Sequence, residues 1–231
     1  MIRLILLGLL LSSTFVSKTN AQLINAGVSG NSTTDLLNRI DKDVLAHRPE
    51  LVILMVGTND LLNSKKIINY SSYQSNLNQI IKKLKSEEIK VLVMSSPPVD
   101  SAYLFRRHDR NLYLAAPNQI LDSASQIVRK VAMENDALFL NLFEKFSELG
   151  LPKHNEDLFF RNQMNSGTKD GVHPTALGYH FIAEQVFQFL KHQKLVHKDL
   201  KIICFGDSIT FGAGVDKSKN YPTYLTHLLA H

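Results

Sequence analysis

Short apolar runs alternate along this chain with longer segments in which apolar residues recur every three or four positions. The continuous run 51–56 is typical of a strand buried on both faces, whereas the spacing of Leu177, Phe181 and Val186 is typical of one helix face. By these two patterns we expect strands over 23–26, 51–56, 91–94, 137–140 and 201–205, and helices within 36–44, 77–84, 120–131, 177–190 and 221–229. Strands that alternate with helices predict a three-layer α/β/α sandwich around a five-stranded parallel sheet.

Two details of the helices can be predicted from single residues. Thr33 or Thr34 is expected to cap the helix that follows the first strand, and Pro174 is expected at the first position of the last long helix. No internal repeat, low-complexity stretch or linker interrupts the alternation. We therefore expect one domain over residues 22–231.

The first 21 residues follow a third pattern. A short positive start ends at Arg3, an apolar run covers 4–16, and small or polar residues lead to Ala21. This layout is typical of a cleavable secretory signal peptide, which predicts a secreted or periplasmic protein. An uncleaved membrane anchor is the competing interpretation, although the apolar run is short for spanning a bilayer. After cleavage we expect no stable membrane insertion.

Charge and cysteine content narrow the range of partners and cofactors that the protein is expected to have. The formal net charge is +5, and removal of residues 1–21 would take away Arg3 and Lys18, leaving 24 − 21 = +3. The few basic pairs make a weak case for nucleic acid, so no nucleic-acid partner is expected. The single cysteine, Cys204, cannot form an intrachain disulfide and is expected to be a small buried residue. The spacing of the histidines predicts no metal site, and no cofactor is expected.

The residues with catalytic potential lie just after expected strands or just before an expected helix. Ser208 follows the strand 201–205 in a Gly-Asp-Ser turn, and His173 lies three residues after Asp170. Acyl transfer by serine needs a nucleophile, a base and a group that orients the base, and these three residues can fill the roles. It also needs donors for an oxyanion, for which the candidates are the backbone N–H groups of Ser208 and Gly30 and the side-chain amide of Asn59.

Each candidate also has a purely structural interpretation. Ser208 can cap a helix, His173 can lie on the surface before a proline, Gly30 can shape a turn and Asn59 can close an Asx turn. Two neighbouring acids, Asp60 and Asp207, are expected to bind local backbone. Five other histidines are expected on the surface, namely His47, His154, His180, His192 and His197.

Four blocks of the sequence together resemble the SGNH or GDSL hydrolases, a family of serine esterases and lipases. The blocks are Gly206-Asp207-Ser208, Asn25-Ala26-Gly27-Val28-Ser29-Gly30, Gly57-Thr58-Asn59-Asp60 and Asp170-Gly171-Val172-His173-Pro174. The resemblance implies a flavodoxin-like sheet, Ser208 as nucleophile with His173 and Asp170, and an oxyanion hole from Ser208, Gly30 and Asn59. In the family the serine block comes first, whereas here it comes last. Placing residues 195–231 before residue 22 would restore the family order, so the resemblance implies a circular permutation.

The resulting expectation is a secreted serine esterase that acts through an acyl-serine intermediate. Its substrate is expected to be a small-molecule or carbohydrate ester with a short acyl group such as acetyl, and the segment 143–168 is expected to form an irregular loop over the site. The alternatives are a lysophospholipase or thioesterase acting on lipids and a non-catalytic binding module with the same fold.

Overall fold

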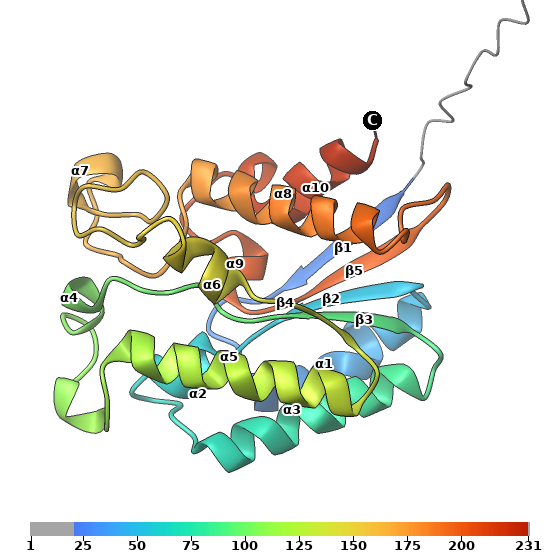
Figure 1. Ribbon diagram of the computed structural model, residues 1–231, viewed down its shortest axis with the longest axis horizontal. Coiled ribbons are helices and arrows are strands. Elements are labelled where there is room, and N and C mark those ends of the chain that lie inside the picture. Colours follow the sequence, from blue (N-terminus) through green and yellow to red (C-terminus); the bar gives the residue numbers. More distant parts are fainter. Residues whose placement is uncertain (1–20, 231) are drawn as a thin grey trace, which may run out of the picture.

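The computed structural model describes residues 21–230, and they form one parallel sheet between two layers of helices (Figure 1). The expected signal peptide lies, except for Ala21, outside the described residues. The sheet has the order β1-β5-β2-β3-β4, with every neighbouring pair parallel. Its strands are β1 (Gln22–Gly27), β2 (Leu51–Met55), β3 (Lys90–Met94), β4 (Leu138–Leu140) and β5 (Lys201–Gly206). The predicted three-layer fold class with a five-stranded parallel sheet is confirmed.

Alternate side chains of each central strand enter two different cores. Val52 and Leu54 pack into the core beneath the helices of one face, whereas Leu51 and Ile53 pack into the core of the other face. The first face is covered by α1 (Thr33–Asp43), α3 (Tyr70–Lys85) and α5 (Pro117–Glu134), and the second by α6 (Leu142–Ser147), α8 (Ala176–His192) and α10 (Tyr221–Leu229). Burial on both faces explains the continuous apolar runs of these strands.

The last strand of the sequence occupies the middle of this arrangement. β5 pairs with β1 on one side and β2 on the other, and Gly206 is level with both Gly27 and Met55. A Cβ on Gly206 would lie 2.2 Å from the carbonyl oxygen of Met55, so only glycine fits this position. The register therefore brings the carboxyl ends of the three strands to one edge of the sheet.

The remaining helices are short and lie mostly at this edge. They are α2 (Thr58–Leu62), α4 (Ser101–Leu104), α7 (Gln163–Ser166), α9 (Ser208–Phe211) and the 3₁₀ turns η1 (Leu45–His47), η2 (Arg110–Leu112) and η3 (Lys217–Lys219). Two predicted details were wrong. α8 begins at Ala176 with Thr175 as its N-cap, because Pro174 is engaged in an antiparallel bridge with Phe160. α1 begins at Thr33, so Ser32 is its N-cap.

Candidate active site

Three neighbouring strands each deliver one candidate residue to the carboxyl edge of the sheet. Gly30 follows β1, Asn59 lies in the first turn of α2 after β2, and Ser208 is the first residue of α9 directly after β5. The Asp207 carboxylate accepts a hydrogen bond of 2.9 Å from the Ile209 N–H and so caps α9. Ser208 therefore lies on a tight turn from strand to helix, as its sequence context predicts.

The structure brings Ser208 together with His173 and Asp170, which precede it in the chain by 35 and 38 residues. The His173 Nε2 atom lies 3.0 Å from Ser208 Oγ. On the other side of the ring, His173 Nδ1 lies 2.9 and 3.0 Å from the two carboxylate oxygens of Asp170. These partners assign the ring proton to Nδ1 and leave Nε2 free to accept the serine proton.

The Asp170 carboxylate is held in its ionised form. Burial alone would raise its pKa, but the hydrogen bond and charge of His173, together with the backbone N–H groups of His173 and Val172, outweigh burial and lower the pKa to about 2. A negative charge at this position stabilises the imidazolium that forms when His173 takes a proton. The arrangement is therefore able to activate a serine hydroxyl.

A cavity of about 310 Å³ opens beside Ser208 and His173, and both Gly30 and Asn59 line it. The Asn59 amide is oriented by its neighbours: its Oδ1 accepts from Asn63 Nδ2 at 3.1 Å and its Nδ2 donates to the Asn31 carbonyl at 3.0 Å. The second N–H of this amide remains available for a ligand. The backbone N–H of Ser208 belongs to the first turn of α9, where N–H groups have no acceptor within the helix.

The loop that carries Asp170 and His173 is held by the segment before α7. Arg161 donates its backbone N–H to the His173 carbonyl at 2.9 Å and accepts from the Gly171 N–H at 2.8 Å. The Thr175 N–H donates to the Phe159 carbonyl at 2.8 Å. Residues 143–168 were expected to form an irregular loop over the site. The stretch between α6 and α7 is irregular, but the segment also includes α7 and most of α6, and the expected position was wrong because none of these residues lines the cavity.

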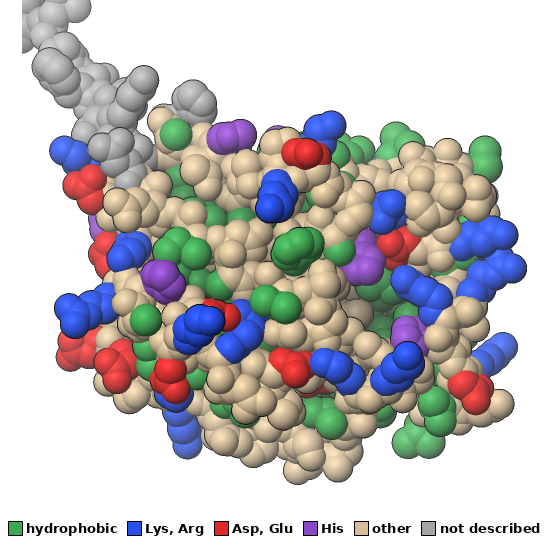
Figure 2. Space-filling view, turned by 180° about the vertical axis from the view of Figure 1, so that it is seen from behind, with side chains coloured by type: hydrophobic (Ala, Val, Ile, Leu, Met, Phe, Trp, Pro, Cys, Tyr) green, Lys and Arg blue, Asp and Glu red, His purple; other side chains and the backbone are tan. Residues whose placement is uncertain are grey.

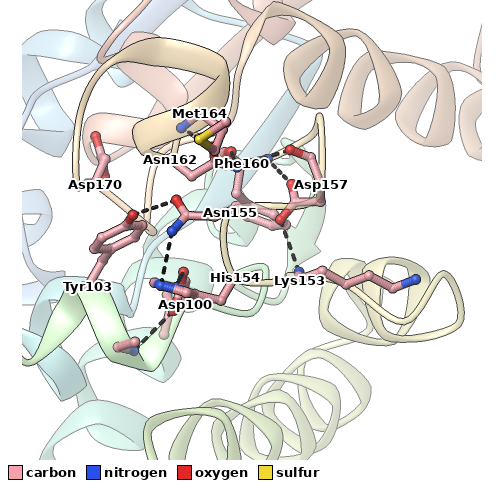
Figure 3. Close-up of polar contacts among 12 residues, drawn as sticks. Asp100, Tyr103, Lys153, His154, Asn155, Asp157, Phe160, Asn162, Met164 and Asp170 are labelled. Atoms are coloured by element: carbon pink, nitrogen blue, oxygen red, sulfur yellow. Dashed lines mark hydrogen bonds and ion pairs between the residues drawn. The ribbon is translucent and has the colours of Figure 1, made fainter.

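A second polar cluster supports the same loop from outside the cavity (Figure 3). The backbone N–H of Asp100 donates to the Gly171 carbonyl at 2.7 Å, and the Asp100 carboxylate lies 2.7 Å from His154 Nδ1. The Tyr103 hydroxyl donates to Asn155 Oδ1 at 2.5 Å, and its ring contacts that of His154. His154 is half exposed, as a surface histidine would be, but the sequence does not reveal its buried carboxylate partner.

Two arginines also contact Asp170, and the sequence patterns identify neither. Arg107 Nη2 donates to the backbone carbonyl of Asp170 at 2.7 Å, and Arg161 Nη1 lies 3.4 Å from Asp170 Oδ2. Both contacts join residues on different loops. The only signal in the sequence is the cluster Arg106-Arg107-His108-Asp109, which by itself indicates a polar surface.

Both acids that were expected to be structural bind backbone groups. Asp60 accepts two bonds from the Thr33 N–H, at 2.9 and 3.1 Å, and a third from the Thr33 hydroxyl. Burial raises the pKa of Asp60, and it raises the pKa of Asp207 to about 7. Within residues 21–230, no group of three or more His, Cys, Asp and Glu side chains is placed to hold a metal ion. None of the described helices is both long and apolar enough to cross a bilayer.

Comparison with known proteins identifies the family. The model of the GDSL-like lipase/acylhydrolase family matches residues 7–181, and this chain belongs to that family. It is accordingly a carboxylic ester hydrolase. The matched segment contains Gly30, Asn59, Asp170 and His173 and ends before Ser208.

Individual relatives are similar over parts of the chain. An acetylxylan esterase from Geobacillus stearothermophilus is 22% identical over 169 residues, which cover 70% of this chain and 68% of the relative. The uncharacterized lipoprotein YqeF of Bacillus subtilis is 31% identical over 83 residues, about a third of each chain. Among solved structures, an acetyl xylan esterase has a TM-score of 0.57 at 22% identity, covering 71% of this chain and 79% of its own. A GDSL-like lipase from Bacteroides thetaiotaomicron has a TM-score of 0.54 at 24% identity, covering 72% and 74%. These structures share the fold.

Proposed function

We propose that the protein is a serine esterase that hydrolyses its substrate through an acyl-Ser208 intermediate. The observation that carries the proposal is the unbroken chain of contacts from Ser208 Oγ through both nitrogens of His173 to Asp170. A non-catalytic binding module has no need of this geometry.

The geometry specifies each proton transfer. Ser208 Oγ attacks the ester carbonyl carbon while His173 Nε2 takes the hydroxyl proton, and the Gly30, Asn59 and Ser208 donors bind the oxyanion. The intermediate collapses when His173 returns the proton to the departing alkoxide, which leaves as the alcohol. A water molecule then gives a proton to His173 and attacks the acyl carbon. This second intermediate collapses when His173 returns that proton to Ser208 Oγ, which releases the carboxylic acid and restores the serine hydroxyl.

For the substrate we propose a short acyl ester, such as acetyl, of a carbohydrate. Two of the relatives are acetylxylan esterases by name, and the cavity is rich in hydroxyl and amide groups from Ser29, Asn59 and Asn63. Thr58 also lines it, and its Oγ1 is buried without a hydrogen-bond partner among the described residues.

A lipid ester is the alternative, because a larger apolar hollow of about 500 Å³ lies near Tyr70 and Leu114. This hollow shares no lining residue with the cavity beside Ser208. An acyl chain in it would have no direct path to the nucleophile, so the carbohydrate ester is the better supported substrate.

We further propose that the protein is exported and that its chain is a circular permutation of the usual family order. Export is supported by the pattern of residues 1–21 and by the similarity to a lipoprotein. The permutation is supported by the central position of β5 and by the family match that ends at residue 181. α10 also contacts β1, which would let the two segments be joined. N-terminal sequencing of the exported protein tests the first proposal, and activity of a chain rearranged as 195–231 followed by 22–194 tests the second.

The test of the function is hydrolysis of aryl acetate, butyrate and octanoate esters by residues 22–231, beside a Ser208→Ala variant. We expect the acetate to be cleaved fastest and the folded variant to be inactive. Equal rates for wild type and variant would refute the acyl-Ser208 mechanism. A preference for octanoate would favour the lipid alternative.

A further inference from the structure

The residues after α4 form a basic wall of the cavity that the catalytic steps do not use. Arg107 and His108 line the cavity together with Ser208 and His173, and no Asp or Glu is found among the described residues that line it. Burial, and then the charges of Arg107 and Lys65, lower the pKa of His108. Lys65 does not line the cavity, but it directly follows Ser64, whose backbone N–H donates to the His108 ring. The neighbouring acid, Asp109, accepts from the Asn111 N–H instead and does not line the cavity.

The hydrogen bonds of His108 fix which of its nitrogens can meet a ligand. The backbone N–H of Ser64 donates to His108 Nδ1 at 3.3 Å, and the Ser64 hydroxyl lies 3.0 Å from the same atom. Because a backbone N–H can only donate, Nδ1 is the acceptor and the proton of the neutral ring is on Nε2. His108 therefore contributes a hydrogen-bond donor to the cavity wall.

Some of the cations around this wall have a carboxylate partner and others do not. Arg107 lies 3.7 Å from the Asp170 carboxylate. Lys66 pairs with Asp35, but in the described part of the chain Lys65 and Arg106 form no ion pair. Arg106 is exposed beside Arg107, and it lines a neighbouring hollow of about 330 Å³ with Lys169, which is likewise unpaired among residues 21–230. Figure 2 shows Lys and Arg side chains grouped around a hollow on one side of the molecule.

Arg107 contributes in two directions. Its Nη2 donates to the Asp170 carbonyl and its Nη1 lies 3.7 Å from Asp170 Oδ1, yet 39% of its side chain remains exposed. A guanidinium has five N–H donors in a planar fork that matches the geometry of a carboxylate. The donors not directed at Asp170 remain available to an anionic ligand.

We propose that the substrate carries a carboxylate on its alcohol part, as in an O-acetylated saccharide that contains uronic acid, and that Lys65, Arg107 and His108 bind this carboxylate. The proposal rests on the proposed esterase function. A short acyl group occupies little of the cavity, so the part of the ester that reaches this wall is the alcohol. Arg106 and Lys169 would attract further carboxylates of the same chain through longer-range electrostatics.

A matched pair of substrates tests the proposal: acetylated oligogalacturonide and its neutral uronamide, with acetate release as the readout. We expect kcat/KM to be about tenfold higher for the acid form at low salt, with the preference shrinking as salt screens exposed charges. The double variant Lys65→Glu/Arg106→Glu should lose the preference. Lys82→Glu/Lys90→Glu makes the same change of charge at exposed sites outside the basic wall and should keep it. Arg107 is left intact in both variants because it also holds Asp170.

Equilibrium binding separates this proposal from the catalytic one. The Ser208→Ala variant is titrated by calorimetry with non-acetylated oligogalacturonide and with its uronamide. Tighter, salt-sensitive binding of the acid form that Lys65→Glu/Arg106→Glu abolishes supports the carboxylate site even if no ester is cleaved. Equal binding of the two forms, or equal kcat/KM for the acetylated pair, overturns the proposal, and cleavage of aryl acetate would then still support the esterase.

Discussion

The two sides of the candidate active site are built by different means. Ser208, Gly30 and Asn59 are positioned by three hydrogen-bonded strands that end level with one another. His173 and Asp170 lie on a loop outside the sheet, held by backbone bonds from Arg161 and Asp100. The sheet therefore fixes the residues of the nucleophile side, whereas contacts between loops fix the residues of the base side.

The two sides also differ in the pKa of the buried carboxyl group that each contains. Asp207, on the nucleophile side, is fully buried, and burial raises its pKa to about 7 despite the bond from Ile209. Asp170, on the base side, is also buried, but the bonds and charge of His173 outweigh burial and lower its pKa to about 2. Of these two buried carboxyl groups, only the one bonded to His173 has a pKa below its ordinary value.

The largest expected effect tests whether the two sides act as one unit. Ser208→Ala and His173→Ala should each lower kcat for an aryl acetate by about 10⁴-fold or more, because neither residue is effective without the other. For the same reason the double variant should lose no more activity than either single variant. Additive losses, measured by steady-state kinetics on folded variants, would show that the sides act independently.

The opposite pKa shifts predict opposite effects of pH on stability. A carboxyl group with a folded pKa near 7 and an ordinary value of 3.8 binds more protons when folded, so Asp207 should lower the free energy of unfolding as pH rises from about 4 to 7. A difference of about three units sets a ceiling of about 4 kcal/mol. Asp170 acts in reverse: its contribution is present above about pH 4 and is lost as pH falls towards 2.

Urea unfolding between pH 2 and 8 measures this contrast. Asp207→Asn preserves an acceptor for the Ile209 N–H but cannot ionise, so the variant should lack the decline between pH 4 and 7. Asp170→Asn should retain that decline. If both variants follow the wild-type curve, the titration arises from other groups.

The next largest effect is expected at Asn59, the side-chain donor proposed for the oxyanion hole on the nucleophile side. Asn59→Ala should lower kcat by about 10²–10³-fold with little change in KM, because the amide contributes most when charge develops on the carbonyl oxygen. Asn63→Ala leaves Asn59 in place but removes one of the two bonds that orient its amide, so a smaller loss is expected. A variant Asn59→Ala with wild-type kcat would exclude the amide from the oxyanion hole.

The smallest effect concerns the support of the base side. His154→Gln removes the contact with Asp100 and should lower kcat/KM by only a fewfold, since the side chain is half exposed and such pairs contribute about 1 kcal/mol or less. His197→Gln is the matched control, because His197 is equally exposed and lies 3.4 Å from Glu50. Equal kinetics for the two variants would show that the Asp100–His154 pair does not support catalysis.

The sequence predicted the nucleophile side well because its positions follow local rules. A buried strand that breaks at Gly206-Asp207-Ser208 places the serine at a sheet edge, and the same pattern applies to the segments ending in Gly30 and Asn59. The spacing of Asp170 and His173 is local too, so their mutual contact could be anticipated. The expected position of residues 143–168 was wrong because this segment is held by backbone bonds between Phe159 or Arg161 and the loop 170–175, and no local pattern records such contacts.

By itself the sequence determined the alternation of strands and helices and the edge of the sheet at which the polar residues gather, and it predicted Ser208, His173 and Asp170 as the residues for acyl transfer. Only the tertiary structure decided that Arg107 and Arg161 approach Asp170 and that Asp100 pairs with His154. Hydrophobic periodicity indicates which face of a segment is buried in the core, and it does so without regard to which other segments lie beside it. Contacts between loops 54 and 63 residues apart depend on how the whole chain packs, and no local pattern records them.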